Sequence, residues 1–164
     1  MRPRRAAEQA ARRALWMVPA GFLVHCAEEL PAFPEWATRH FGTTTTRFYI
    51  ASHCVLIPGM VGVVASGARP GATRGGTTLA AAVAFGLIAN AGFHAVAMRR
   101  FGEYSPGVVT GLGVMAPVSA HGLWRLRGAG VLGRGDLLAA ALLGAGLNAA
   151  AVGSLRLDAP RLSG

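Results

Sequence analysis

Five long apolar runs, separated by short polar or glycine-rich connectors, constrain the fold more than any other feature of this sequence. The runs cover residues 14–30, 48–66, 77–98, 106–124 and 137–154. A helix needs about 17 to 25 mostly apolar residues to cross the hydrocarbon layer of a membrane, and each run meets this requirement. Only 14% of the residues are charged, whereas soluble domains carry about 25%. We therefore predict an all-α protein, a polytopic transmembrane helical bundle of about five spans.

The segments outside these runs have compositions that end helices. Two prolines in LPAFPEW follow the first run, which is the weakest of the five, and they should end or bend its helix. The connectors SGARPGATRGG and RLRGAGVLGRGD are rich in glycine and arginine, which indicates turns. The predicted organisation is a basic N-terminal segment at 1–13, a transmembrane helical domain at 14–154 and a short C-terminal tail at 155–164.

The arginines give information on processing, partners and orientation. An arginine-rich start before an apolar run resembles a signal peptide, but Glu28 and Glu29 follow this run without an Ala-x-Ala cleavage site, so we expect an uncleaved span. All 16 basic residues are arginine, and they form no stripe beside aromatic residues, which argues against nucleic acid as a partner. A cytoplasmic N-terminus places ten arginines inside and six outside, as the positive-inside rule favours.

Small residues and cysteines leave two questions open. The glycine- and alanine-rich fifth run has small residues at a spacing that lets membrane helices approach closely. Whether copies of the chain associate as a homo-oligomer is left open. Cys26 and Cys54 form no Cys-x-x-Cys pair and are most simply packed hydrophobic residues. Whether they pair is also left open.

Polar residues from separate runs fall at one depth on the outer side of the predicted bundle, given about 1.5 Å of rise per residue. They are His25, Glu28, Glu29, His53, Asn90, His94, Thr110 and Asn148, with Glu103 and Tyr104 in the loop before the fourth run. His121 is expected at the opposite face. Charged groups inside a membrane cost at least about 2.5 to 3.5 kcal/mol each, so they are rare and usually functional. This pattern predicts an inward-facing polar site.

Helical spacing supports a shared site. His25, Glu28 and Glu29 stand at positions i, i+3 and i+4, and Asn90 and His94 stand at i and i+4. Residues with these spacings share one face of a helix. Two helices would therefore each present a polar face to the other.

Each of these residues also has a structural interpretation. The two glutamates and His94 can be interfacial charges, and His25 can form a hydrogen bond within the bundle. His53 can be a packed histidine, while Asn90 and Asn148 can join helices by hydrogen bonds. The functional interpretation rests on the joint pattern and not on any single residue.

Three short motifs occur in order along the chain: HCAEE is His-x-x-Glu-Glu, NAGFH is Asn-x-x-x-His and PGVVT is Pro-Gly-x-x-Thr. With these motifs the sequence resembles the bacterial HXXEE-motif family of small integral membrane proteins. The resemblance implies a polytopic protein of the bacterial inner (plasma) membrane and points to an enzyme, but it transfers no reaction. The residues to which it transfers importance are His25, Glu28, Glu29, Asn90, His94, Pro106, Gly107 and Thr110. Membrane proteases of the CAAX-processing type have a similar Glu-Glu motif, but theirs continues to an arginine that EELPAF lacks.

The first functional hypothesis is acid–base catalysis on an apolar small molecule that enters from the lipid bilayer. Two neighbouring carboxylates do not both ionise easily, so one can donate a proton that a histidine accepts or relays. This chemistry suits isomerisation or cyclisation of an isoprenoid or sterol-like lipid. The candidate catalytic residues are His25, Glu28, Glu29, Asn90, His94 and Glu103. The candidate substrate-binding residues are His53, Tyr104, Pro106, Gly107 and Thr110.

Two alternatives use the same residues. In a metal-dependent membrane hydrolase or oxidase, the nitrogen and oxygen ligands would suit zinc, iron or manganese. The candidate ligands are His25, Glu28, Glu29 and His94. In a proton-coupled transporter, the same groups would relay protons. The sequence contains no His-Glu-x-x-His motif, and it therefore slightly favours the acid–base hypothesis.

Overall fold

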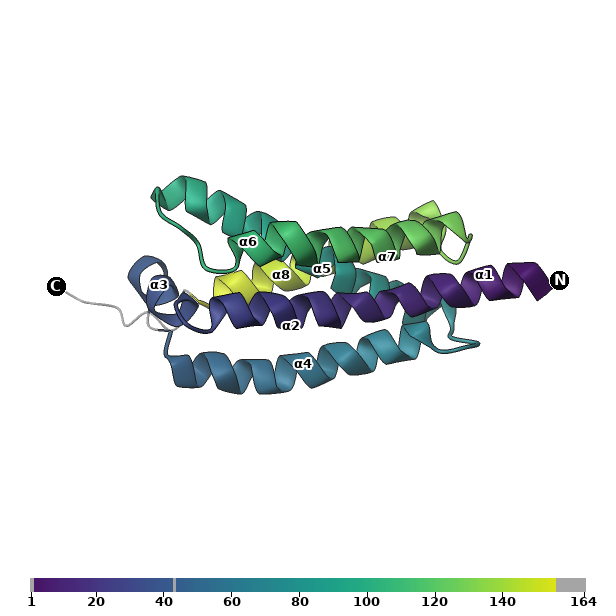
Figure 1. Cartoon of the computed structure of the whole chain (residues 1–164), viewed down its shortest axis with the longest axis horizontal. Helices are drawn as coiled ribbons and strands as arrows, with labels where there is room; N and C mark the ends of the chain where they lie inside the picture. Colours follow the sequence, from purple (N-terminus) through teal and green to yellow (C-terminus); the bar gives the residue numbers. More distant parts are fainter. Residues whose placement is uncertain (1, 43, 156–164) are drawn as a thin grey trace.

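The computed structural model describes residues 2–42 and 44–155, and within this part of the chain all regular structure is helical, with no strand. Long helical rods run side by side along one axis, and a short helix lies at one end of the bundle (Figure 1). The all-α class expected from the apolar runs is therefore confirmed.

Two of the rods change helical type along their length. The first rod consists of α1 (Arg2–Arg13), a 3₁₀ turn (Ala14–Trp16) and α2 (Met17–Glu29). Another consists of α6 (Val108–Thr110), a π-helical turn (Gly111–Met115) and α7 (Ala116–Gly128). The remaining helices are α3 (Phe33–His40), α4 (Thr46–Ala68), α5 (Arg74–Phe101) and α8 (Arg134–Ser154).

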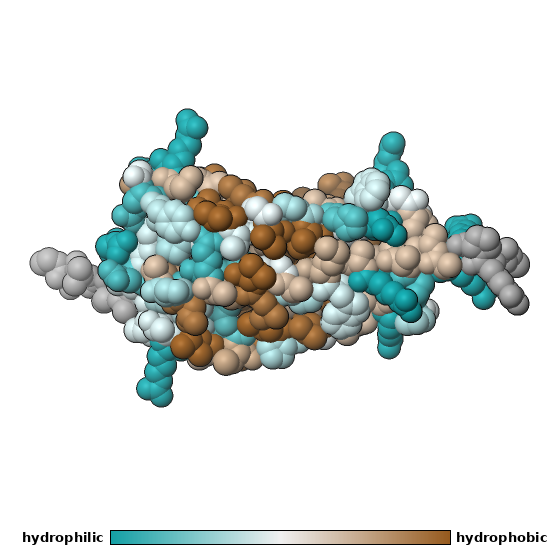
Figure 2. All heavy atoms as spheres, in the orientation of Figure 1, coloured by the Kyte–Doolittle hydropathy of each residue, from teal (hydrophilic) through white to brown (hydrophobic). Residues whose placement is uncertain are grey.

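Three helices are long and apolar enough to cross a membrane, namely α4, α5 and α8. They coincide with three of the five predicted spans. The other two predicted spans lie within the α1–α2 and α6–α7 rods, whose crossing of the membrane remains a prediction. Figure 2 shows hydrophobic residues gathered in the middle of one face and hydrophilic residues toward both ends, an arrangement suited to a bilayer.

Local sequence explains where the helices begin and end. The chain leaves α2 at Glu29, before the first proline of LPAFPEW, and Pro34 lies in the first turn of α3, as expected for a residue without a backbone N–H. The hydroxyl groups of Thr45 and Thr73 each accept a hydrogen bond of 3.1 Å from a backbone N–H of α4 or α5. These side chains cap the two helices.

The centre of the bundle is α5, which packs against α4, α7 and α8. Its contact with α8 is close because both helices have a glycine at the crossing. A Cβ atom on Gly144 would lie only 2.6 Å from the backbone nitrogen of Gly86. The close approach expected of the fifth run is therefore found here. Because α5 is central, its side chains can meet residues from several other helices.

Candidate functional site

Three buried side chains from α2 and α5 converge near one end of the bundle. The imidazole nitrogens Nε2 of His25 and His94 lie 3.5 and 3.1 Å from the Oε1 atom of Glu29. Both histidines are fully buried, and Glu29 is only 5% exposed. One ligand atom from each of the three residues lies within 4.8 Å of the others. We call His25, Glu29 and His94 the central triad.

Hydroxyl groups contact the two imidazole rings on the Nδ1 side, opposite to the Nε2 atoms that face Glu29. The Nδ1 atom of His94 lies 3.0 Å from the hydroxyl oxygen of Ser105, and Nδ1 of His25 lies 3.4 Å from that of Thr110. These contacts turn both Nε2 atoms toward Glu29. Although the Nε2–Oε1 distances are short, neither Nε2 atom makes a hydrogen bond of acceptable geometry. Two buried nitrogen atoms are thus aimed at a carboxylate oxygen without being satisfied by it.

The second oxygen of Glu29 has its own partner. The hydroxyl of Tyr49, on α4, donates a hydrogen bond of 2.9 Å to Oε2 of Glu29. Tyr49 is not among the residues predicted from the sequence, although it stands four residues before His53 on the same helical face. This spacing of four residues could have indicated that Tyr49 lies near the site.

Glu28 contacts the start of α6, and the hydroxyl of Thr110 lies between its carboxylate and the His25 ring. Its carboxylate accepts hydrogen bonds from the hydroxyls of Tyr104 and Thr110, and from the backbone N–H groups of Val109 and Thr110 at 3.2 and 2.7 Å. Glu28 therefore caps the start of α6 from a neighbouring helix. Its hydrogen bond also raises the pKa of Tyr104, in the connector, to about 12. The structure does not bring Glu28 together with the other candidate ligands, so the paired carboxylates of the acid–base hypothesis are separated.

Glu103 lies outside the central triad as well. Its Oε1 atom is 2.7 Å from Nε2 of His40 and 3.2 Å from a guanidinium nitrogen of Arg39. The hydrogen bonds from His40 and Arg39 lower the pKa of Glu103. This carboxylate joins α3 to the connector after α5. The structure places Glu103 in this contact and does not bring it together with the central triad, so its catalytic role stays a prediction.

The Pro-Gly motif forms the wall of the central triad. Gly107 has a φ angle of +98°, in the region that favours glycine. A Cβ atom at this position would lie 2.5 Å from Cε1 of His25 and 3.0 Å from both Cγ of Glu29 and Cε1 of His94. Pro106, which precedes it, is buried in the connector. Gly107 therefore allows the backbone to approach all three members of the triad.

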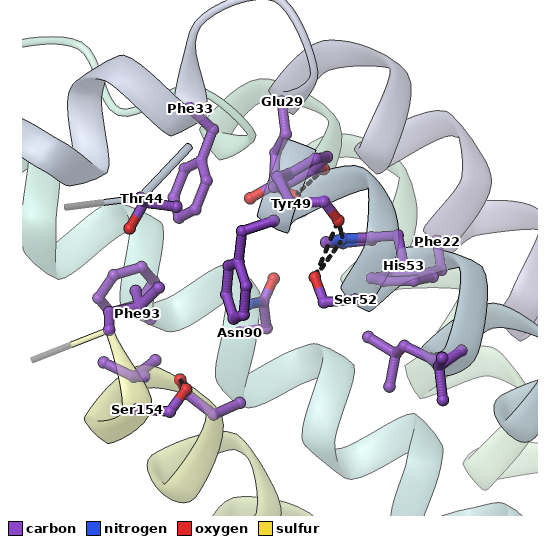
Figure 3. A pocket seen from close by; sticks show the side chains of 16 residues that line it. Phe22, Glu29, Phe33, Thr44, Tyr49, Ser52, His53, Asn90, Phe93 and Ser154 are labelled. Carbon is purple, nitrogen blue, oxygen red and sulfur yellow. Dashed lines mark hydrogen bonds between the residues drawn. The ribbon is translucent and has the colours of Figure 1, made fainter. Parts of the chain in front are cut away.

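A cavity of about 470 Å³ reaches Glu29 from the side of α4, α5 and α8 (Figure 3). His53 lies in its wall, with Nδ1 2.8 Å from the carbonyl oxygen of Tyr49 and its ring stacked on the Tyr49 ring. Asn90 also lines the cavity, and its Oδ1 atom is buried without a hydrogen-bond partner. Asn90 and His53 thus face the cavity beside the central triad and do not belong to the triad itself.

Cys26 supplies a second grouping that includes Glu29. One ligand atom each from Cys26, Glu29 and His53 also lies within 4.8 Å of the others. Cys26 and Cys54 are both free thiols. His121, expected at the opposite face, packs beside Trp124 on α7, with 5.8 Å between the ring centroids.

The profile of one protein family matches residues 16–121, which is more than half of the chain. The family is described as "protein of unknown function with HXXEE motif". The chain belongs to this HXXEE family. The match contains all three motifs that form the site, from His25 to Thr110. Comparison with curated proteins and with solved structures finds no significant match.

In this HXXEE protein, residues of the three motifs contact one another in the folded structure. The HCAEE motif provides His25 and Glu29 to the triad, and its Glu28 accepts hydrogen bonds from the PGVVT segment. NAGFH provides His94, and PGVVT provides the glycine wall and the hydroxyl behind His25. Sequence reasoning missed Ser105, the hydroxyl behind His94, which directly precedes the Pro-Gly pair.

Proposed function

We propose that this HXXEE protein is an integral membrane enzyme in which His25, Glu29 and His94 bind a divalent metal ion and act on a lipid-soluble substrate by hydrolysis. The observation that carries the proposal is the convergence of two buried, unsatisfied Nε2 atoms on one buried carboxylate oxygen. Buried polar atoms normally have partners, so buried atoms without one are positions where an ion or a water can bind. A cation between these three atoms would satisfy all of them.

The donor set fits such an ion. Two imidazole nitrogens and one carboxylate oxygen suit zinc, iron or manganese, and catalytic zinc sites commonly use three protein ligands with one open position. When bound, the metal would supply an activated water for hydrolysis. Metal-binding histidines usually hydrogen-bond through their other nitrogen, and Ser105 and Thr110 hold the two Nδ1 atoms in this way.

The fold supports a membrane location with five crossings. The α1–α2 and α6–α7 rods lie alongside the three apolar helices α4, α5 and α8 in Figure 1. We propose that all five rods span the bacterial inner membrane, with the start of α1 in the cytoplasm as the arginine count favours. The central triad then lies near the outer ends of α2 and α5, in reach of the bilayer through the cavity.

Acid–base catalysis is the second candidate, and one observation favours it. Glu29 contacts both histidines and accepts a hydrogen bond from Tyr49, so protons can pass among these groups without a metal. In this version Glu29, and not Glu28, would exchange a proton with an isoprenoid-like substrate during isomerisation or cyclisation. The metal content of the protein separates the two candidates.

Replacing Glu29 with glutamine is expected to remove stoichiometric zinc, iron or manganese from the detergent-purified full chain. The neighbouring Glu28→Gln variant is the comparison, because its carboxylate contacts α6 and reaches His25 only through the Thr110 hydroxyl. It should therefore keep the metal, at most with a lower affinity. Elemental analysis of both variants and the parent measures this directly. A folded parent without metal, or metal that disappears only from the Glu28 variant, would contradict the metal proposal.

Replacing Ser105 with alanine should weaken metal binding by about 10- to 100-fold, the usual cost of losing a group that orients a ligand. The reason is that the hydroxyl holds Nδ1 of His94 at 3.0 Å. Thr78→Ala is the control, because the Thr78 hydroxyl donates a hydrogen bond of 2.9 Å to the backbone carbonyl oxygen of Arg74, in the same helix, and no contact joins it to the central triad. Competition with a metal-sensitive dye gives the affinities, and equal affinities in all three proteins would refute this role.

A further inference from the structure

A second cavity continues the first one along the central helix. It measures about 270 Å³ and shares Phe22, Leu56, Asn90 and Ala151 with the cavity that reaches Glu29. Along α5 the combined walls extend from Ala82 to Phe93, two residues that are 11 positions, or about 16 Å of helix, apart. The two cavities together therefore form one elongated groove on α5.

The groove changes in polarity from one end to the other. Near the central triad its wall carries Glu29, Thr44, Ser52 and His53. Farther along α5 the wall is made mainly of aliphatic side chains, among them Met60, Val63, Val83, Leu87 and Leu147. Such a wall matches a molecule with a polar head and an apolar tail.

The groove lies between α4 and α8. Both helices pack on α5, but they have almost no contact with each other. Leu56 on α4 and Leu147 on α8 line the second cavity and are each more than half exposed at the surface. In a bilayer this opening faces the acyl chains, so a lipid can enter sideways without crossing water.

Asn90 marks the junction between the two ends. This residue lines both cavities, and its Oδ1 atom is buried beside them without a hydrogen-bond partner. Because a buried acceptor without a partner is costly, a donor on a ligand would stabilise this position. The acceptor stands where the head of a bound lipid would meet its tail.

We propose that this groove binds a single-chain lipid ester, or the lipid alcohol that hydrolysis of the ester releases, with its head at the central triad and its linear tail along α5 between α4 and α8. The inference rests on the proposed function, since it states where the substrate of the proposed enzyme binds. It narrows the substrate to one extended chain, because the groove is elongated along the helix axis. A fused-ring sterol is therefore excluded from the proposal.

The test uses a diazirine derivative of hexadecanol for photolabelling of the full chain in detergent micelles. We expect labelled residues on α4, α5 and α8, and we expect Leu147→Trp, which fills the groove, to reduce labelling by about tenfold or more. Leu142→Trp is the matched control on the same helix, because Leu142 is 68% exposed and lies outside both cavity walls. Farnesol and hexadecanol should compete with the label, and cholesterol should not.

The outcomes separate this inference from the proposed function. Labelling that is equal in the Leu147 and Leu142 variants, or competition by cholesterol as strong as that by farnesol, would overturn the groove proposal. Metal content is measured on the same samples. If metal remains while labelling fails, only the groove proposal falls, whereas a folded parent that is labelled but holds no metal contradicts the metal-dependent function alone.

Discussion

Replacing His94 with alanine is expected to abolish metal binding and turnover. His94 is the only member of the central triad that comes from α5, and the two that remain, His25 and Glu29, lie one turn apart on α2. Without His94, the ion would have protein ligands from α2 alone and none from the facing helix α5. The loss of affinity should therefore exceed the roughly 10- to 100-fold expected for removing a supporting residue.

Two further variants make the His94 experiment decisive. His94→Gln keeps most of the volume of the fully buried ring, so that loss of metal can be separated from a packing defect. His121→Ala is the matched control, because it removes a histidine that contacts Trp124 and is not part of either ligand grouping. Elemental analysis and thermal unfolding are measured on each protein. Metal retained in a folded His94 variant would show that the triad is not the binding site.

The helical architecture could be predicted because apolar runs of sufficient length have few alternatives in a membrane. The prolines at 31 and 34 correctly indicated the end of α2. The helix α3 was not predicted, since its eight residues are too few for a span and its amphipathic pattern is short. Its place depends on tertiary contacts, such as the burial of Trp36 among aromatic rings and the docking of Arg39 and His40 on Glu103.

The candidate site could be predicted only in part. Helical spacing correctly grouped His25 with Glu29 and indicated His94 as the partner from another run. It could not separate Glu28 from Glu29, because adjacent residues differ by about 100° around the helix axis and each can face a different neighbour. Only the contacts that α5 and α6 make with α2 in the folded protein assign Glu29 to the histidines and Glu28 to a helix cap.

Replacing Gly107 with alanine is expected to have the second large effect, on both stability and metal binding. At a φ angle of +98° an L-residue costs about 1 to 2 kcal/mol, and overpacking a dense site costs about 1 to 3 kcal/mol more. The added methyl group would meet His25, Glu29 and His94 at 2.5 to 3.0 Å. The triad must spread apart to admit it, so metal affinity should fall together with the unfolding temperature.

Gly102 offers the matched control for this substitution. It ends α5 with a φ angle of +69°, but no atom lies within 4 Å of the position of an added Cβ. Gly102→Ala should therefore show only the backbone cost, with metal content unchanged. The difference between the two variants in thermal unfolding and elemental analysis measures the contact with the triad. Equal effects of the two substitutions would mean that Gly107 serves as a turn residue alone, and that the PGVVT motif does not shape the metal site.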